Sequence, residues 1–356
     1  MAKTRVGIIG AGSISGAHVR AFQASGQVEI TAIWNRTRAR AEKLAETSGL
    51  EPQIVRDEWQ SMLEQGDVDV VSIVTAPQLR AEPVRMALEK GIHVLVEKPI
   101  ATTTAIGREM VEMSQASDCV CAVCFTWRYK PSNMAARRLI QDGSIGTLRH
   151  YSSAWRFSFP TALRNTEVRP FINEANGGHG MLGENGSHQF DMFSFLTGER
   201  VEQLTGQVEW VANDSDTDRV NWCYHLVGRT DSGAMASFQI TTPPGPVFGE
   251  SQRSVHMEGP AGSVRIDGGI IDDGKTWVRI GDEDGVRAIN PEDLGLSSRP
   301  GHEALVADFL CAITERGNRP ECLPTLEDGL RSLELIECAL RADEQRRWVS
   351  ISEACD

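Results

Sequence analysis

The sequence begins with a short apolar stretch that leads directly into a glycine-rich segment. Residues 5–9 (RVGII) have the composition of a buried strand, the segment GAGSIS follows, and residues 15–24 have helical spacing. The first glycine permits a tight turn, the second permits close approach of a pyrophosphate, and a small residue such as Ser15 lets the helix pack on the strand. Backbone N–H groups at the start of that helix can then bind phosphate. We therefore predict a dinucleotide-binding loop, rather than an ordinary glycine-rich turn, that includes Gly10, Gly12, Ser13 and Ile14.

Strand and helix patterns alternate through residue 125 and then change. Strand-like runs at 28–34, 68–75 and 93–96 alternate with helical segments such as 38–46 and 80–90, which predicts a doubly wound parallel sheet. Beyond residue 125, strand-like runs follow one another between turn sequences, which is typical of an antiparallel sheet. We predict an α/β protein with two domains, at residues 1–125 and 126–356, whose C-terminal helices can pack back on the first domain.

The charge balance excludes two classes of partner. The chain has 36 Lys and Arg against 49 Asp and Glu, which gives a formal net charge of −13. A strongly acidic protein lacks the electrostatic attraction that nucleic acids and anionic membranes require. No apolar run approaches the roughly 18 residues of a membrane helix, and the first residues lack the layout of a signal peptide. We expect a cytoplasmic protein that binds neither nucleic acid nor membrane.

The eight cysteines are expected to be reduced thiols. Cys119, Cys121 and Cys124 form a C-x-C-x-x-C pattern that could serve as half of a zinc site. The stretch around them is apolar throughout, however, and free cysteine is among the most frequently buried residue types. The sequence has no second Cys/His cluster ready to complete the site. We interpret the stretch as a buried strand and expect no metal.

The end of the second predicted strand bears on cofactor choice. An Asp or Glu about 20 residues past the glycine motif would bind the ribose 2′-hydroxyl of NAD. This chain has Asn35 there, followed by Arg36, Thr37 and Arg38. Guanidinium, hydroxyl and amide groups suit a 2′-phosphate, so the pattern favours NADP(H). NAD(H) remains the alternative, because Asn also bonds a ribose hydroxyl and the arginines could simply lie on a solvated helix face.

Two short motifs follow later strands of the predicted parallel sheet. Thr75-Ala76-Pro77 follows one, and Glu97-Lys98-Pro99 follows another. Open α/β sheets bind ligands at the carboxyl ends of their strands, so we expect both motifs beside the cofactor. Pro99 restricts the backbone next to Lys98 and helps to hold that lysine in one place.

A third constellation lies in the second half of the chain. Glu184, His188 and Asp191 have spacing i, i+4 and i+7, so they share one face if the segment is helical. Three interpretations stay open. The group could bind a metal, the histidine could be an ordinary buried residue, or it could be an acid–base histidine with carboxylate support.

Taken together, these motifs resemble the Gfo/Idh/MocA family, named for glucose–fructose oxidoreductase, inositol dehydrogenase and a rhizopine catabolism protein. The resemblance covers the whole chain. It rests on Gly10-Ala11-Gly12, on HVLVEKPIA around Lys98, on the segment from Glu184 to Asp191, and on PTLEDGLRSLELIE at residues 324–337. It implies an N-terminal Rossmann domain and a C-terminal α+β domain with a large open, mostly antiparallel sheet that forms a homodimer or homotetramer.

The resemblance also implies roles for individual residues. Lys98 and His188 match the family's catalytic lysine and histidine, and Arg128 matches an arginine that often lies near cofactor or substrate. Glu184 stands where the family commonly has Asp, and Arg80 stands where it commonly has His. Arg80 could favour an acidic substrate, or it could only pair with Glu82 or Glu97.

The resulting expectation is hydride transfer between NAD(P) and a secondary alcohol or ketone of a sugar, sugar derivative or cyclitol. His188 would move the hydroxyl proton, Lys98 would stabilise the developing alkoxide, and Glu184 would orient Lys98 or a substrate hydroxyl. Asp191 would orient His188 or its helix, or contact substrate, and Trp127, Trp155, Phe157 and Phe159 could form a floor under a sugar ring. Two alternatives remain: a redox-assisted glycoside-cleaving or eliminating enzyme that retains its cofactor, and a non-catalytic dinucleotide-binding regulator.

Overall fold

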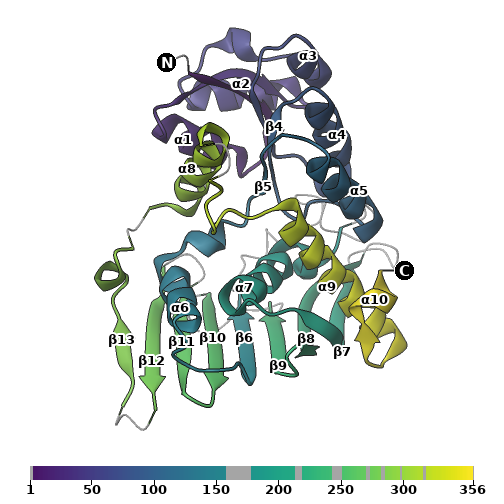
Figure 1. Ribbon diagram of the computed structural model, residues 1–356. Coiled ribbons are helices and arrows are strands. Elements are labelled where there is room, and N and C mark those ends of the chain that lie inside the picture. The colour runs from purple at the N-terminus through teal and green to yellow at the C-terminus, as the bar shows by residue number, and fades with distance from the viewer. Residues whose placement is uncertain are drawn as a thin grey trace. The chain divides into compact units, whose positions relative to one another are not determined.

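A computed structural model describes residues 3–157, 178–212, 219–242, 251–269, 273–281, 285–296, 299–315 and 318–355. The chain divides into two compact units (Figure 1). The first comprises Met1–Thr126 and Arg299–Leu330, and the second comprises Trp127–Ser298 and Arg331–Asp356. The first unit therefore takes in a C-terminal segment as well as the N-terminal third of the chain.

The first unit is built on a five-stranded parallel sheet with the order β2-β1-β3-β4-β5. All four residues of the central strand β3 are buried, as expected for a sheet covered on both faces. The predicted parallel sheet is confirmed. Its strands are β1 (Thr4–Ile9), β2 (Val28–Trp34), β3 (Val70–Ile73), β4 (His93–Val96) and β5 (Cys121–Val123).

Helices connect these strands and place the strand ends at one edge of the sheet. The helix α8 comes from the distant C-terminal segment and packs against α1. The α-helices of this unit are α1 (Ser15–Ala24), α2 (Arg38–Thr47), α3 (Trp59–Glu64), α4 (Ala81–Glu89), α5 (Thr104–Gln115) and α8 (Gly301–Thr314). Short 3₁₀ turns are η1 (Pro52–Ile54) and η2 (Pro77–Leu79), and η3 (Thr126–Tyr129) begins at the boundary between the units.

The second unit contains a nine-stranded sheet with the order β13-β12-β11-β10-β6-β9-β8-β7-β14. The pair β6–β9 is parallel and the other pairs are antiparallel, which confirms the predicted mostly antiparallel sheet. The strands are β6 (His150–Arg156), β7 (Val201–Ala212), β8 (Arg219–Thr230), β9 (Met235–Thr241), β10 (Gln252–Gly259), β11 (Gly262–Gly269), β12 (Lys275–Ile280), β13 (Arg287–Ile289) and β14 (Val349–Ser350).

Helices cover one face of this sheet (Figure 1). Buried residues alternate with exposed or half-buried ones along β9, as one covered face requires. Phe193 of α7 packs against Tyr151 and Phe238 of the sheet, with ring centroids 4.9 Å and 5.6 Å apart. The helices are α6 (Pro131–Gln141), α7 (Ser187–Thr197), α9 (Leu326–Gln345) and α10 (Ile351–Ala354), with a π-helical turn η7 (Leu182–Gly186) and a 3₁₀ turn η8 (Pro291–Leu294).

Across the described residues, none of the helices combines the length and apolarity that crossing a bilayer requires.

Candidate active site

The glycine-rich loop between β1 and α1 is held by its own polar groups. Gly10 has a φ of +111°, and a Cβ there would lie 2.7 Å from the backbone oxygen of Val74, so this position requires glycine. The Ser15 hydroxyl donates to the Gly10 carbonyl at 3.0 Å and accepts from the Gly12 N–H at 2.9 Å. A Cβ on Gly12, by contrast, would meet nothing within 4 Å. This open space at the N-terminus of α1 fits a pyrophosphate. Two further predicted residues are exposed there: Ser13 and Ile14.

Asn35 joins the glycine loop to the turn after β2. Its side-chain oxygen accepts from the Ala11 N–H at 3.0 Å, and its amide donates to the Thr37 carbonyl oxygen at 3.0 Å. Asn35, which we predicted to bind the ribose, thus connects the glycine-rich loop to the turn after β2 through two hydrogen bonds.

The two arginines after Asn35 have different surroundings. Arg38 donates to Glu42 at 2.8 Å and also pairs with Asp57. The hydrogen bond to Glu42 and the charge of Asp57 raise the pKa of Arg38, whose charged guanidinium already has two carboxylate partners. Arg36 is exposed at the start of the turn. Of the pair, Arg36 is therefore the better candidate for contact with a 2′-phosphate.

Arg80 connects the ends of β3 and β4. Arg80 is 5% exposed, and its Nε and Nη2 donate to the Thr75 carbonyl oxygen at 2.9 and 2.6 Å. Nη1 donates to the carbonyl oxygen of Glu97 at 2.9 Å and to that of Pro99. The buried Arg80 side chain therefore donates hydrogen bonds to backbone carbonyl oxygens in both motifs that we predicted to lie beside the cofactor. The other residues of the first motif are the half-buried Ala76 and the buried Pro77.

From the sequence, Arg80 could have formed an ion pair with Glu82, but the structure pairs Glu82 with a different arginine. Glu82 pairs with Arg85 on the same helix, at 2.6 Å. Arg80 is the N-cap residue of α4 and follows Thr75 closely in sequence. Its side chain can therefore extend back to the ends of the strands.

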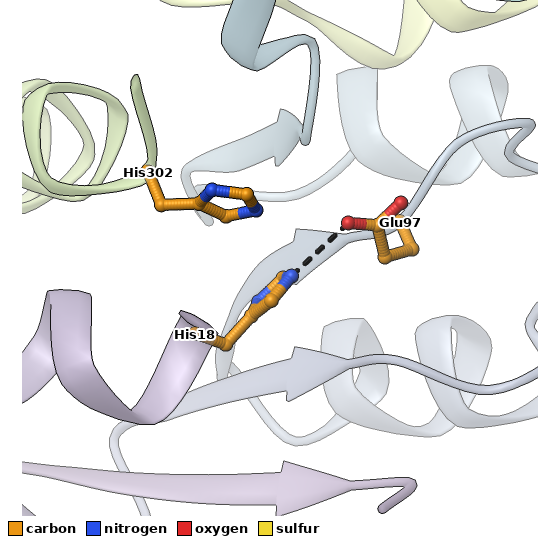
Figure 2. Close-up of side chains that lie close together, drawn as sticks. All are labelled: His18, Glu97 and His302. Atoms are coloured by element: carbon orange, nitrogen blue, oxygen red, sulfur yellow. Dashed lines mark hydrogen bonds and ion pairs between the residues drawn. The ribbon is translucent and has the colours of Figure 1, made fainter. Parts of the chain in front are cut away.

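Glu97 anchors the loop that carries Lys98. One carboxylate oxygen accepts from the Lys98 N–H at 3.0 Å, and the other lies 3.1 Å from Nε2 of His18 (Figure 2). Burial alone would raise the pKa of Glu97, but the hydrogen bond to His18 and the charges of His18, Lys98 and Arg80 hold it below its usual range. Lys98 is half-buried, and its peptide bond to Pro99 is cis. The Glu97 side chain is therefore engaged in fixing the backbone next to the lysine.

Glu97 also belongs to a cluster that the sequence did not predict. His18 from α1 and His302 from α8 lie beside it, with the two imidazole centroids 5.3 Å apart (Figure 2). Burial and the charge of His18 lower the pKa of His302 to about 4. Cys124 Sγ lies 3.7 Å from His18 Nε2, and burial raises the pKa of this thiol. These residues come from four separate segments, so no local spacing could have revealed them.

In the second unit, His188 lies on α7 beside two tryptophans. It is buried, and its ring centroid is 5.7 Å from that of Trp127. Trp127 in turn stacks on Trp155, with centroids 4.4 Å apart and planes 14° from parallel. Next to His188, Gln189 donates to the backbone oxygens of Ser153 and Gln239, which ties α7 to the sheet. Trp127 thus lies against the imidazole, and Gln189 fixes the helix that carries it.

Glu184 lies in the π-helical turn η7 immediately before α7. It is half-buried, whereas His188 and Asp191 follow on regular helix. The predicted helix is confirmed, but the wider turn changes the simple i, i+4 relation between Glu184 and His188. π-Turns of this kind are frequent at functional sites. A Cβ on Gly186 would lie 2.9 Å from the Tyr224 hydroxyl, so the turn packs closely on the sheet.

Arg128 and Asp191 form a buried ion pair with one another. Nε of Arg128 lies 2.9 and 3.1 Å from the two carboxylate oxygens of Asp191, and Nη2 makes a further contact. Arg128 is 4% exposed and Asp191 is 3% exposed. The pair joins η3 to α7, one turn after His188. Contact of Arg128 with the cofactor, and of Asp191 with substrate or His188, stay predictions.

One residue of the sequence analysis, Phe159, lies outside the described residues. Of the remaining aromatic residues, Phe157 is buried and packs edge-on to Trp155, with centroids 6.2 Å apart.

Comparison with known proteins agrees with this arrangement. Residues 4–125 match the oxidoreductase family with an NAD-binding Rossmann fold, and residues 133–264 match the GFO/IDH/MocA C-terminal domain. The chain belongs to the Gfo/Idh/MocA family of oxidoreductases. The resemblance inferred from the motifs is thus confirmed.

Several members of the family match nearly the full length of this chain. Inositol 2-dehydrogenase from Rhizobium meliloti is 25% identical over 98% of this chain and 99% of its own. D-apiose dehydrogenase from Paraburkholderia graminis is 26% identical over 97% of this chain and 88% of its own. A solved structure of levoglucosan dehydrogenase with NADH and levoglucosan is 22% identical, with a TM-score of 0.85 over 98% of this chain and all of its own. The last likeness establishes the fold.

Proposed function

We propose that this Gfo/Idh/MocA protein transfers a hydride between NAD(P) and a secondary alcohol or ketone of a sugar, sugar derivative or cyclitol. The observation that supports this most is the loop carrying Lys98. Its carbonyls are bound by Arg80 and its backbone N–H by Glu97, at the carboxyl end of a parallel strand. A half-buried lysine fixed in this way is suited to act on a ligand at the sheet edge.

The cofactor is proposed to lie along the glycine loop and the strand ends of the first unit. Gly10, Gly12, Ser13 and Ile14 would hold the pyrophosphate, and the exposed Arg36 with Thr37 would hold a ribose 2′-phosphate. We therefore favour NADP(H), with NAD(H) as the alternative. When bound, the nicotinamide supplies the hydride acceptor or donor.

Lys98 would act on the reacting oxygen of the substrate. During oxidation that oxygen develops negative charge, and in reduction it is a carbonyl that must be polarised. An ammonium group aimed at this atom stabilises both forms, and such preorganised charge is usually the larger part of catalysis. The Glu97 contact to the Lys98 backbone and the Arg80 contacts to the loop would keep the ammonium in place.

His188 would move the hydroxyl proton. It would accept the proton during oxidation and return it during reduction, since an imidazole changes protonation near neutral pH. Its ring packs near Trp127 and its helix is tied to the sheet by Gln189, which limits the orientations the ring can adopt. Glu184 would orient a substrate hydroxyl or Lys98, and Asp191 would hold α7 through Arg128.

The substrate class follows from the chemistry and from the relatives. Relatives named as inositol, D-apiose and levoglucosan dehydrogenases span the length of this chain. Trp127 is partly exposed and stacks on the buried Trp155, so it offers an aromatic face of the kind that packs against a sugar ring. We further propose a homodimer or homotetramer formed through the nine-stranded sheet, to be tested by light scattering.

The test is a comparison of Lys98→Ala and His188→Ala with two matched controls. Lys90→Ala removes an exposed lysine of the first unit, and Arg138→Ala removes an exposed cation of α6 in the second, away from the strands of the proposed interface. We expect both site variants to bind cofactor as the wild type does and to lose at least about 10²-fold in kcat, the usual contribution of an acid–base group. The controls should retain wild-type turnover.

Near wild-type kcat in either site variant would refute its assigned role. Turnover of a glycoside without net formation of NAD(P)H would support the redox-assisted cleaving enzyme instead. Cofactor binding with no turnover of any polyol or sugar would support a regulator.

A further inference from the structure

We propose that His18, Glu97, Cys124 and His302 form a structural zinc site in the first unit. Two neutral imidazoles, a carboxylate and a thiolate are a donor set that suits Zn²⁺ in tetrahedral coordination. Nothing in the proposed hydride transfer requires this ion, so the proposal stands independently of the proposed function.

The separations between the donor atoms match a tetrahedral site. His18 Nε2 lies 3.1 Å from Glu97 Oε1 and 3.7 Å from Cys124 Sγ. Around one zinc ion with ordinary bond lengths, these separations would be about 3.3 Å for nitrogen and oxygen and about 3.6 Å for nitrogen and sulfur. The thiol of Cys124 is also within hydrogen-bonding reach of the Glu97 carboxylate. Three donors are thus already arranged around one point.

His302 approaches two of these donors, those of His18 and Glu97, from α8. Its donor atom and those of His18 and Glu97 all lie within 4.8 Å of one another, and Figure 2 shows a ring nitrogen of His302 turned toward the other two side chains. The two imidazole centroids are 5.3 Å apart. Two histidines bound tetrahedrally to one zinc ion would have centroids about 5.2 Å apart.

The surroundings of His18 orient it as a ligand. Nδ1 of His18 lies 2.8 Å from the Ser72 hydroxyl, which leaves Nε2 as the atom directed at the cluster. Histidine ligands commonly have such a partner on the second ring nitrogen, because it fixes the tautomer and the ring plane. His18 and Ser72 are both buried, as are Glu97 and Cys124.

The charges of the site also balance. With zinc bound, one thiolate and one carboxylate offset the two positive charges of the ion. The competing explanation is a hydrogen-bonded network without metal, in which His18 and Cys124 donate to Glu97. That network accounts for the contacts of His18 with Glu97 and Cys124. It does not explain why His302, from a distant segment, places a ring nitrogen close to His18 and Glu97.

The ion would join four segments of the first unit. His18 lies on α1, Glu97 follows β4, Cys124 follows β5 and His302 lies on α8. A closed four-ligand site is structural rather than catalytic. It would pin the distant α8 segment to the sheet and would fix the Glu97 loop.

The experiment uses the full-length protein produced without a histidine tag. We would measure zinc by mass spectrometry after gel filtration, then remove it with a chelator and titrate Co²⁺. We expect one equivalent of zinc, a lower melting temperature after chelation, and a cobalt spectrum with tetrahedral visible bands and a thiolate charge-transfer band.

Variants identify the ligands. Cys124→Ser should abolish the charge-transfer band, and His302→Ala should abolish stoichiometric zinc, whereas Cys119→Ser, outside the cluster, should leave both unchanged. Should either variant fold poorly, the wild-type measurements alone decide the proposal. It is overturned if folded wild type holds no stoichiometric zinc and gives no tetrahedral cobalt spectrum, or if the charge-transfer band survives in Cys124→Ser.

Discussion

The Nη1 atom of Arg80 donates a 2.9 Å hydrogen bond to the backbone carbonyl oxygen of Glu97. The same side chain binds the Thr75 carbonyl from its opposite edge. One buried guanidinium therefore sets the separation of two strand ends that we assign to the cofactor site. Arg80, which the sequence left open between a substrate contact and an ion pair, supports the Lys98 loop through the carbonyl oxygens of Glu97 and Pro99.

Replacing Arg80 should affect both stability and turnover. Arg80→Ala leaves buried carbonyl oxygens without their donor, which should lower the free energy of unfolding by about 2–4 kcal/mol. In protein that remains folded, kcat should fall more than KM rises, because the lysine is displaced while ground-state contacts remain. Urea unfolding and steady-state kinetics measure the two effects. Arg85→Ala, which loses only exposed ion pairs, is the control and should match wild type.

The Arg128–Asp191 ion pair should contribute to the free energy of unfolding. Asp191→Ala leaves a buried guanidinium without its carboxylate and should cost about 3–5 kcal/mol in urea unfolding. The double variant Arg128→Met/Asp191→Leu should recover much of that loss, since apolar residues of similar volume can replace a buried pair. An Asp191→Ala protein of unchanged stability with a raised KM would show that Asp191 contacts substrate instead.

The two glycines of the cofactor loop should respond differently to alanine. Gly10→Ala forces a side chain into a positive φ and against the Val74 carbonyl, so it should lower stability by about 1–3 kcal/mol even without ligand. Gly12→Ala meets open space, so its melting temperature without ligand should be unchanged. Its added methyl group should nevertheless weaken dinucleotide binding, as calorimetric titration would detect. Unchanged binding by Gly12→Ala would place the pyrophosphate elsewhere.

Cofactor preference should depend on Arg36. Removing a charge-assisted contact of about 1.5–3 kcal/mol should weaken NADP⁺ binding in Arg36→Ala by roughly 10–100-fold. NAD⁺ binding should stay within a factor of about two, since NAD⁺ lacks the 2′-phosphate. Arg149→Ala, another exposed arginine, is the control. Equal weakening of both cofactors would contradict the assigned contact.

The sequence was most informative where structure is set by local periodicity. The helix at Ser15–Ala24 and the strands at Val28–Trp34 and His93–Val96 have the bounds that were predicted, because each is a regular apolar pattern ended by turn residues. The antiparallel sheet was likewise predicted from turn spacing. Pairing partners such as β6 with β9 were not, since register and order depend on contacts far apart in sequence.

Side-chain partners were much less predictable than elements. Arg38 was predicted as a phosphate ligand, and nothing in the sequence indicated that Glu42 and Asp57 would both bind its exposed guanidinium. His302 gave no signal at all, because its relation to His18 arises only when α8 packs on α1. The π-turn at Glu184 was likewise not predicted, and within it Gly186 packs closely on Tyr224, a residue distant in sequence.

The most direct test of the proposed reaction is a turnover assay with a panel of cyclitols, aldoses, anhydrosugars and glucosides, each with NAD⁺ and NADP⁺. NAD(P)H formation and product formation would be measured in the same reactions, for wild type and Lys98→Ala. Our account predicts that at least one secondary alcohol yields NAD(P)H and ketone in equal amounts, and that Lys98→Ala binds the cofactor without forming either. Product without net NAD(P)H, or equal turnover by Lys98→Ala, would contradict it.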